Sequence, residues 1–451
     1  MILPLISVPY LSRVMGAERM GEYSYTFSIV NYFMLISMLG ISNYGNKQIS
    51  RVRDNKEMIY KTFWEIYAIQ FSMALLLSFA YLAYLFVFCT SYNVLAWIQF
   101  LCLISCFFDI NWFFFGLEKF KITVTRNSII KIVTIFLILL FIKSDRDVWK
   151  YTLIMSTSTL LSQMILWKFL TKQIKLRKVS FGGMKQHIKE IIVLFIPVIA
   201  YSVYKIMDKT MIGSFKGVVD LGYFEYAEKI YNMPLALITA LGTIMLPKVS
   251  NMLSRKQFNE VKALTYKSLE FIYFAAFPIT FGLISVSRDF CIGFLGQDYS
   301  RTGDLLIGLA FCIIFVSVAN VIRTQILIPE GKNKEYVLAT CFGATINLIL
   351  NLVFIPKLGA VGACIGTVAA EFFVMLYQII CVKKFFVVEE NMKKICKYLL
   401  SSVIMAVVIN VIGCFIDGLW IRIFMKVITG GIIYMTLNIK YVFNLLGYRK
   451  Q

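Results

Sequence analysis

The chain has 451 residues, of which 59% are hydrophobic and only 16% are charged, and its mean hydropathy is +0.75. A soluble domain carries about 25% charged residues, so a chain this apolar would aggregate in water and is expected to reside in lipid. The net charge of +21 does not indicate nucleic-acid binding, because the basic residues lie in short loops between apolar runs, where they orient membrane helices.

Apolar runs of about helical length follow one another along the chain, and we expect fourteen of them. Each is near the roughly 20 residues that a helix needs to cross a bilayer, except the first. Their approximate spans are 1–13, 22–45, 62–88, 94–116, 122–142, 149–170, 190–212, 222–246, 266–286, 303–328, 336–355, 359–382, 395–416 and 420–443. The runs are longer than barrel strands and do not alternate, so they predict an all-α polytopic membrane protein with about 14 transmembrane helices.

The first run is unusually short. Residues 1–12 are apolar and Arg13 follows them, which leaves too few residues for a spanning helix. The run also lacks the basic start and the small-residue cleavage site of a signal peptide. We therefore expect that the first helix is truncated and that the sequence begins inside it.

Two similar segments lie about two hundred residues apart. GEYSY at 21–25 corresponds to GYFEY at 222–226, and LISMLG, which ends at Gly40, corresponds to LITALG, which ends at Gly242. The first and second expected helices thus align with the seventh and eighth. Because an even number of helices separates the copies, the repeat is parallel, related by an axis along the membrane normal.

This duplication predicts two parallel-repeat six-helix bundles that face each other across a central cleft, an arrangement suited to alternating access. The expected parts are an N-terminal bundle at 1–170, a basic cytoplasmic linker at 171–189, a C-terminal bundle at 190–382 and two additional helices at 395–443. The linker contains no acidic residue, so it is expected to lie on the anionic inner leaflet.

The distribution of basic residues predicts the orientation. If the loop after the second helix is cytoplasmic, the cytoplasmic loops hold 29 of the 46 Lys and Arg residues and the outer loops hold 10. In this count, residues near the ends of the runs, Arg126 and Arg422 among them, belong to the loops. The bias follows the positive-inside rule and places both termini in the cytoplasm, including Arg449 and Lys450 at the C-terminus.

Several basic residues remain inside the spans, where a charge costs a few kcal/mol unless it faces water or a partner. Lys426 and Lys440 lie near helix ends and are expected to snorkel to the interface. Arg13 lies at the outer end of the first helix and joins the set. The expected substrate-binding residues are Arg13, Lys131, Lys205, Lys209, Lys229 and Arg323.

Acidic residues fall on the same polar helix faces, at spacings of three and four. Those expected to tune the cations, or to carry a coupling proton or sodium ion, are Asp109, Asp208, Glu225 and Glu228. The alternative for two pairs, Lys205 with Asp208 and Glu225 with Lys229, is that they only neutralise each other along a helix.

An excess of positive charge in a low dielectric suits an anion, phosphate above all. Polar faces with Tyr and Trp suit sugars. A substrate with a pyrophosphate, sugars and a long lipid tail would use all three environments. No cofactor and no metal site are expected, since the only histidine is His187 and no CxxC pair occurs among the ten cysteines.

Four segments, in order along the chain, resemble the bacterial oligosaccharide repeat-unit flippases of the Wzx family. They are residues 3–50, which begin LPLISVPYLSRVMGAERMGEYSY, then FDINWFFFGLEKFK at 108–121, MDKTMIG at 207–213 and GAVGACIGTVAAE at 359–371. No single motif is decisive, but the ordered set covers almost the whole chain.

The resemblance implies membership of the multidrug, oligosaccharidyl-lipid and polysaccharide exporter superfamily, with a MATE-like fold in which the two six-helix bundles form a V-shaped central cavity. It implies a transporter that flips undecaprenyl-pyrophosphate-linked oligosaccharide repeat units across the bacterial cytoplasmic (plasma) membrane, for capsule, O-antigen or exopolysaccharide synthesis. Arg13 matches the position at which relatives place cavity arginines, and 395–443 matches their lipid-tail groove. The implied partners are the lipid-linked glycan, membrane lipids and a glycan polymerase, with no nucleic acid.

Two alternatives stay open. A cation-coupled multidrug antiporter of the same superfamily would want an acidic, aromatic cavity, whereas bases outnumber acids inside these spans. A membrane polysaccharide polymerase or glycosyltransferase would be an enzyme and would need a large outer loop with catalytic groups, whereas the longest expected outer loop is only 287–302. The favoured expectation is therefore a flippase that makes and breaks no bond.

Overall fold

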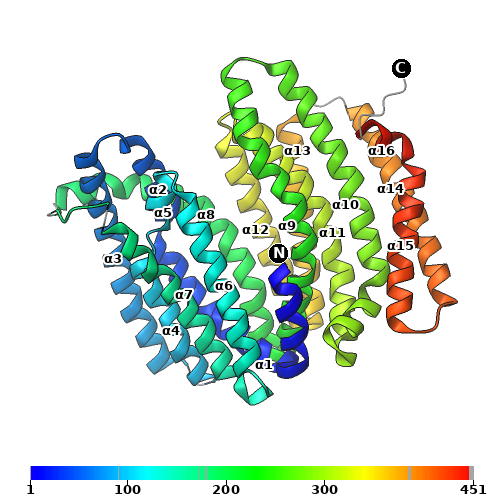
Figure 1. Ribbon diagram of the computed structural model, residues 1–451, viewed down its shortest axis with the longest axis horizontal. Helices are drawn as coiled ribbons and strands as arrows, with labels where there is room; N and C mark the ends of the chain where they lie inside the picture. The colour runs from blue at the N-terminus through cyan, green and yellow to red at the C-terminus, as the bar shows by residue number, and fades with distance from the viewer. Residues whose placement is uncertain are drawn as a thin grey trace. The chain divides into compact units, whose positions relative to one another are not determined.

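The computed structural model describes residues 2–89, 91–171, 173–177, 179, 181–383 and 388–445, and every regular element among them is a helix (Figure 1). This confirms the expected all-α class. Lys172, Lys178 and Ser180 of the expected linker, and Arg449 and Lys450 of the tail, lie outside the described residues.

The chain divides into two compact units, Met1–Gly222 and Tyr223–Gln451. The helices of the first unit are α1 (Ile2–Met38), α2 (Ile41–Val52), α3 (Lys56–Val87), α4 (Asn93–Phe108), α5 (Asn111–Gly116), α6 (Phe120–Phe141), η1 (Asp145–Asp147), α7 (Val148–Leu170) and α8 (Phe181–Lys216). The bundle boundaries expected from the repeat remain a prediction.

The second unit begins within α9, whose first turn belongs to the first unit. Its helices are α9 (Val218–Ser254), α10 (Phe258–Leu295), η2 (Gln297–Tyr299), α11 (Ser300–Ile322), η3 (Arg323–Leu327), α12 (Asn333–Leu358), α13 (Ala360–Cys381), α14 (Val388–Cys414), α15 (Leu419–Leu437) and α16 (Ile439–Leu445).

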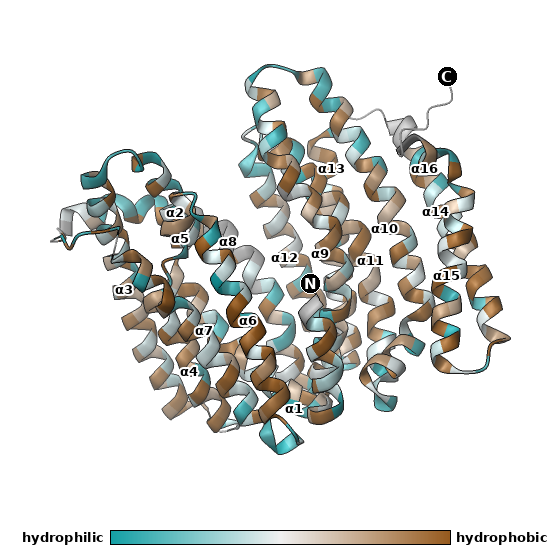
Figure 2. Ribbon diagram, viewed as in Figure 1, coloured by the Kyte–Doolittle hydropathy of each residue, from teal (hydrophilic) through white to brown (hydrophobic). Residues whose placement is uncertain are grey.

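Twelve segments of the described chain are helical, long and apolar enough to cross a membrane. The first of them, Pro4–Val52, contains two of the expected spans, interrupted at Gly16, where φ is 75° and ψ is 178°. Helix α8 covers the expected span 190–212 but is not one of the twelve, so the count of fourteen stays a prediction. Large apolar side chains such as Phe79 and Phe136 are exposed on the helices, as lipid contact requires. Hydrophobic residues recur along the length of these helices (Figure 2).

The two glycines that open the repeated segments meet at one helix crossing in the first unit. A Cβ added to Gly21 would lie 1.7 Å from the carbonyl oxygen of Val218, and a Cβ added to Gly222 would lie 1.8 Å from that of Ala17. Each glycine thus faces the carbonyl four residues before the other, so the contact is reciprocal. Glycine is retained here because only small residues let membrane helices approach so closely.

A buried histidine fastens the start of α8 to α2 and α3. The side chain of His187 is 7% exposed; its Nδ1 lies 2.5 Å from the hydroxyl of Tyr44, and its Nε2 lies 3.1 Å from a carboxylate oxygen of Glu65. The preceding segment is held as well, since the indole of Trp64 donates to the carbonyl of Lys175. The described part of the expected linker therefore packs on α3.

Replacing His187 by alanine is expected to lower the apparent melting temperature of the detergent-solubilised protein. Two buried polar groups, on Tyr44 and Glu65, would each lose a hydrogen-bond partner at a cost of about 1–3 kcal/mol. Tryptophan fluorescence on heating measures the change. The matched control is Lys189→Ala, at an exposed position of the same helix, which should melt like the unaltered protein; equal melting of both variants would contradict the fastening role.

Candidate functional site

Helices α1 and α8 of the first unit meet along polar side chains. The hydroxyl of Thr210 donates to that of Ser28 at 3.0 Å, and the hydroxyls of Tyr25 and Ser214 lie 3.2 Å apart. A Cβ added to Gly213 would lie 2.3 Å from the Tyr25 ring, so the ring packs on the α8 backbone. The side of α8 that carries Thr210, Gly213 and Ser214 is therefore seated on α1.

Five of the predicted charged residues of the first unit occupy three helices. Asp208 is buried, with 3% exposure, whereas Lys205 and Lys209 on the same helix are half-buried. Arg13 on α1 and Lys131 on α6 are exposed. The structure thus brings the three α8 residues onto one polar helix and leaves Arg13 and Lys131 on separate elements.

A buried arginine that the sequence analysis counted with a loop lies inside the first unit. Arg126 on α6 is 6% exposed and donates to Asn111 Oδ1 at 2.9 Å and to the carbonyl of Ser162 at 2.5 Å. The amide of Asn111 also donates to Gln163 Oε1 at 2.9 Å and to Asp109 Oδ1 at 2.7 Å. The predicted residue Asp109, which directly follows α4, therefore belongs to a network that joins α5, α6 and α7.

The sequence did carry a signal for this arginine. Thr123, Arg126 and Thr134 recur at helical spacing and are all buried. The guanidinium Nε of Arg126 has no hydrogen-bond partner among the described residues. A charged residue that lies near the end of an apolar run, and is therefore assigned to a loop, can thus be enclosed by neighbouring helices.

Replacing Arg126 by methionine, which keeps most of its length, is expected to destabilise the first unit. Asn111 and Ser162 would lose a charged donor, and each acceptor left unpaired costs about 1–3 kcal/mol. The apparent melting temperature in detergent measures the effect. Lys121→Met, an exposed basic residue on the same helix, is the control, and equal melting of the two variants would contradict a structural network around Arg126.

In the second unit, three predicted residues lie on one turn of α9. The amine of Lys229 lies 3.3 Å from a carboxylate oxygen of Glu225 and 5.7 Å from the centre of the Tyr226 ring. Glu225 is buried, and Glu228 is half-buried. Glu225 and Lys229 thus form the ion pair along the helix that was one of the two alternatives, while both remain on the polar face of α9.

Arg323 opens a π-helical turn, η3, in which one extra residue per turn interrupts the α-helical pattern. Its guanidinium lies 5.6 Å from the centre of the Tyr336 ring. The neighbouring side chain of Gln325 is fully buried, and neither of its amide atoms has a partner among the described residues. A Cβ added to Gly242 on α9 would lie 2.1 Å from the side-chain oxygen of Asn320. Single π turns occur frequently at functional sites.

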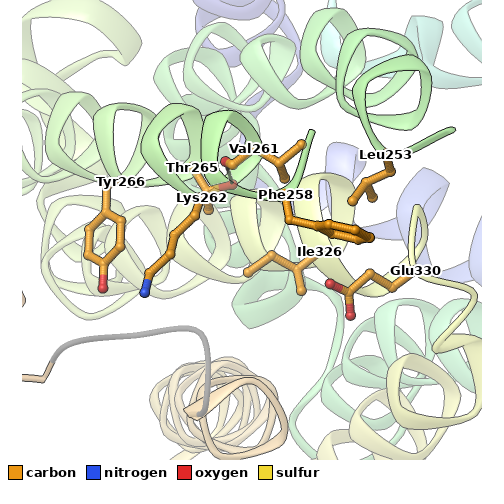
Figure 3. Close-up of a pocket in the computed structure, with 8 residues that line it drawn as sticks. All are labelled: Leu253, Phe258, Val261, Lys262, Thr265, Tyr266, Ile326 and Glu330. Carbon is orange, nitrogen blue, oxygen red and sulfur yellow. Dashed lines mark hydrogen bonds between the residues drawn. The ribbon is translucent and has the colours of Figure 1, made fainter. Parts of the chain in front are cut away.

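A pocket at the α9–α10 connection is too small for a glycan (Figure 3). Its cavity volume is about 30 Å³, which is room for about two water molecules. The residues that line it are Leu253, Phe258, Val261, Lys262, Thr265, Tyr266, Ile326 and Glu330. Across the part of the chain that the structure describes, no group of three or more His, Cys, Asp and Glu side chains could hold a metal ion.

Comparison with known proteins shows the family to which the chain belongs. The family model described as polysaccharide biosynthesis protein matches residues 1–253, more than half of the chain. The chain belongs to the polysaccharide biosynthesis protein family. This member of the family is 23% identical over 389 residues to a putative O-antigen transporter of Shigella dysenteriae, a match that covers 85% of this chain and 96% of the relative.

Solved structures show the fold of this polysaccharide biosynthesis protein. One similar structure is the lipid II flippase MurJ in an inward closed conformation, with a TM-score of 0.77, 19% identity and coverage of 99% of this chain and 97% of that one. Another is an inward-facing multidrug resistance MATE family transporter of the MOP superfamily, with a TM-score of 0.63, 12% identity and coverage of 85% and 95%.

The expected MATE-like fold and the resemblance to Wzx-type transporters of this superfamily are therefore confirmed. The relatives are transporters and flippases, which also confirms that the protein is not an enzyme.

Proposed function

We propose that the protein is a flippase that moves lipid-linked oligosaccharide repeat units, carried on undecaprenyl pyrophosphate, from the inner to the outer leaflet of the bacterial cytoplasmic membrane. The observation that carries the proposal is the similarity to a putative O-antigen transporter over 96% of that relative's length. The fold shared with a lipid II flippase over 99% of this chain is consistent with it.

The cations inside the helices suit the pyrophosphate of such a substrate. A Lys or Arg near the centre of a spanning helix costs about 2.5–3.5 kcal/mol on insertion scales, so its presence calls for a partner or a wet surface. Lys205 and Lys209 on α8, and Arg323 at the π turn of η3, are the residues that we assign first to the phosphates. Lys and Arg bind phosphate oxygens as a point charge and as a planar fork respectively.

The other predicted residues receive supporting roles in the proposal. Arg13 and Lys131 would attract the substrate from the exposed surfaces of α1 and α6. Lys229 would act together with its partner Glu225. The carboxylates of Asp109, Asp208 and Glu228 would tune the cations or carry a coupling proton or sodium ion. Transport by alternating access requires that the substrate bind the inward- and outward-facing states with different affinity.

The proposal also assigns the ends of the protein. Both termini would lie in the cytoplasm, as the positive-inside bias predicts. The two additional helices at 395–443 would form a groove for the lipid tail of the substrate, and a glycan polymerase would receive the flipped repeat units.

Complementation tests the proposed function. The gene would be expressed in bacterial strains that each lack their own repeat-unit flippase and that make different lipid-linked glycans. Restored glycan at the cell surface in at least one strain is the expected result. Normal abundance in the membrane without surface glycan in any strain, together with gained resistance to cationic dyes, would replace the flippase with a multidrug antiporter.

A further inference from the structure

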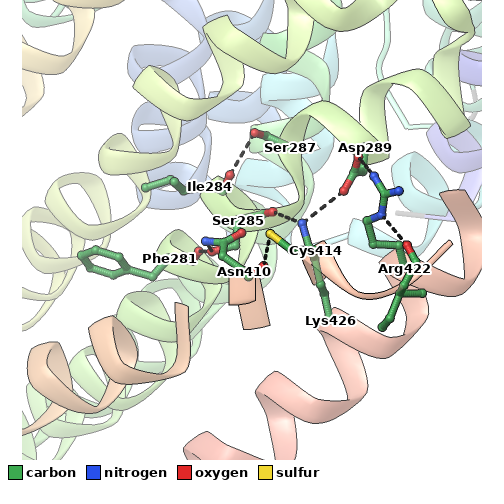
Figure 4. Close-up of polar contacts among 10 residues, drawn as sticks. Phe281, Ile284, Ser285, Ser287, Asp289, Asn410, Cys414, Arg422 and Lys426 are labelled. Carbon is green, nitrogen blue, oxygen red and sulfur yellow. Dashed lines mark hydrogen bonds and ion pairs between the residues drawn. The ribbon is translucent and has the colours of Figure 1, made fainter. Parts of the chain in front are cut away.

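An open pocket with one polar wall lies in the second unit among α10, α14 and α15, close to the connection between α14 and α15. Figure 4 shows the polar contacts of this wall. Its cavity volume is about 720 Å³. The residues that line it are Ile284, Ser285, Ser287, Arg288, Asp289, Ile307, Asn410, Gly413, Cys414, Arg422 and Lys426. The orientation predicted from the basic residues places this end of the unit at the outer leaflet.

Two pairs of residues, each four apart, build the polar wall of the pocket. Ser285 and Asp289 lie on α10, and Arg422 and Lys426 lie on α15. The amine of Lys426 donates to the carbonyl of Ser285 at 3.0 Å and to Asp289 Oδ2 at 3.1 Å. Arg422 reaches the other oxygen of the same carboxylate at 3.4 Å and also donates to the carbonyl of Ile416 at 3.1 Å. One carboxylate is thus shared by two cations (Figure 4).

Lys426 corrects an expectation from the sequence. It was expected to extend freely to the interface by snorkelling, but it is only 7% exposed. A Cβ added to Gly413 on α14 would lie 2.3 Å from its Cε, so the lysine stem passes directly over this glycine. The expectation was wrong because the carboxylate on α10 and the bare backbone of α14 hold the amine inside the unit.

The charges of the pocket do not balance. Three cations, Arg288, Arg422 and Lys426, line it together with one carboxylate, Asp289. Arg288 pairs with Asp304 at 2.5 Å, which still leaves two carboxylates for three cations. An uncompensated charge at the edge of a bilayer is costly, so the arrangement favours a bound anion. Arg and Lys side chains with free space in front of them suit phosphate oxygens.

The surroundings indicate that the anion belongs to a lipid. Side chains next to the cations on α15 are apolar and open to the bilayer: Ile421 and Phe424 are each 62% exposed. Trp420 at the start of α15 is exposed as well, and Trp is enriched where a membrane protein meets the headgroups. A ligand with a phosphate and hydrocarbon chains would contact both surfaces, whereas free phosphate would leave the apolar surface unused.

We infer that this pocket binds the anionic phosphate headgroup of a membrane lipid, with Arg422, Lys426 and Arg288 holding the phosphate and Asp289 competing with it for the cations. The cations of this pocket differ from those assigned to the pyrophosphate of the transported substrate, while α14 and α15 are the helices proposed to hold its lipid tail. The inference concerns a resident membrane lipid and does not depend on the proposed function.

Lipid titration of the delipidated, full-length protein tests the inference, with native mass spectrometry to count bound molecules. The probes are phosphatidylglycerol, diacylglycerol with the same chains, and inorganic phosphate. Phosphatidylglycerol is expected to bind, and diacylglycerol is expected to bind at least about tenfold more weakly. If inorganic phosphate competes as well as the lipid does, the ligand is a free anion and the lipid assignment is overturned.

Two variants separate a binding site from a structural clamp. The double variant Arg422→Gln/Lys426→Met should weaken phosphatidylglycerol binding about tenfold or more, and Asp289→Asn should strengthen it, because the competing carboxylate is gone. The control is Lys397→Met, at an exposed position of α14 far from the pocket along the chain. It should leave phosphatidylglycerol binding unchanged. If Asp289→Asn lowers the melting temperature and does not strengthen lipid binding, the cluster only fastens α15 to α10 and the inference fails.

Discussion

Replacing Gly21 by valine is expected to remove most of the folded protein from the membrane. The new Cβ would lie 1.7 Å from the Val218 carbonyl oxygen, and a backbone atom cannot turn aside as a side chain can. The helices would have to separate along the crossing, so the cost should reach or exceed the roughly 1–3 kcal/mol typical of overpacking. Gly222→Val should have the same effect, because the contact is reciprocal. Membrane abundance by immunoblot and melting in detergent measure both.

A substitution at a glycine outside this crossing serves as the control. Gly182 on α8 has no atom within 4 Å of an added Cβ, so Gly182→Ala should be neutral or slightly stabilising, by up to about 1 kcal/mol from helix propensity. Gly21→Ala should still destabilise the protein. Wild-type abundance of Gly21→Val would show that the two repeated segments do not pack at this point.

Replacing Lys205 or Arg323 by alanine is expected to reduce surface glycan about tenfold or more while the protein remains in the membrane. A lost charge-assisted contact to phosphate is worth about 1.5–3 kcal/mol, which corresponds to about 10- to 150-fold. Both side chains are half-buried, so their removal should disturb packing little. Cell-surface glycan, quantified against the amount of the protein in the same membranes, gives the result.

The control for these two variants is Lys357→Ala, an exposed lysine in the last turn of α12, which should export normally. Normal export by both Lys205→Ala and Arg323→Ala would remove these residues from the substrate path. Loss of export together with loss of the protein would assign them to folding instead. Only loss of export with wild-type abundance supports the assignment to the substrate.

The helices could be predicted from the sequence because few backbone conformations satisfy their own hydrogen bonds within lipid. Within hydrocarbon, every N–H and C=O must bond inside its own segment, so the length and apolarity of a run are enough to predict a helix. The break at Gly16 and the amphipathic helix α2 were not predicted. Both lie where the runs end, and there local turns, not hydropathy, decide the structure.

The repeated segments LISMLG and LITALG have similar sequences but different local structures. In the first copy, Leu39 and Gly40 adopt positive φ values of 43° and 72°, and α1 ends there. In the second copy, Gly242 lies inside α9 and lets Asn320 approach the helix backbone. The same residues thus end one helix and pack another, and only the neighbouring elements decide between these outcomes.

Charges were predicted less well than helices. Arg126 and Arg422 were counted with loops because they lie near the ends of apolar runs, yet Arg126 is buried and Arg422 shares Asp289 with Lys426. Their partners come from other helices, and helix-to-helix pairing is invisible in the periodicity of a single run. The π turn at Arg323 could not be predicted from the sequence either, because no characteristic residue composition distinguishes a π turn from the α-helix around it.

The most direct test of the account is transport by the purified protein in liposomes. A fluorescent oligosaccharide on a polyprenyl pyrophosphate would be placed in both leaflets, and an enzyme added outside would modify only the sugars that it can reach. The account predicts that liposomes with the protein expose the inner-leaflet pool to the enzyme, and that Lys205→Ala and Arg323→Ala slow this exposure. If liposomes with and without the protein expose only the outer-leaflet pool, the protein does not flip lipid-linked glycans.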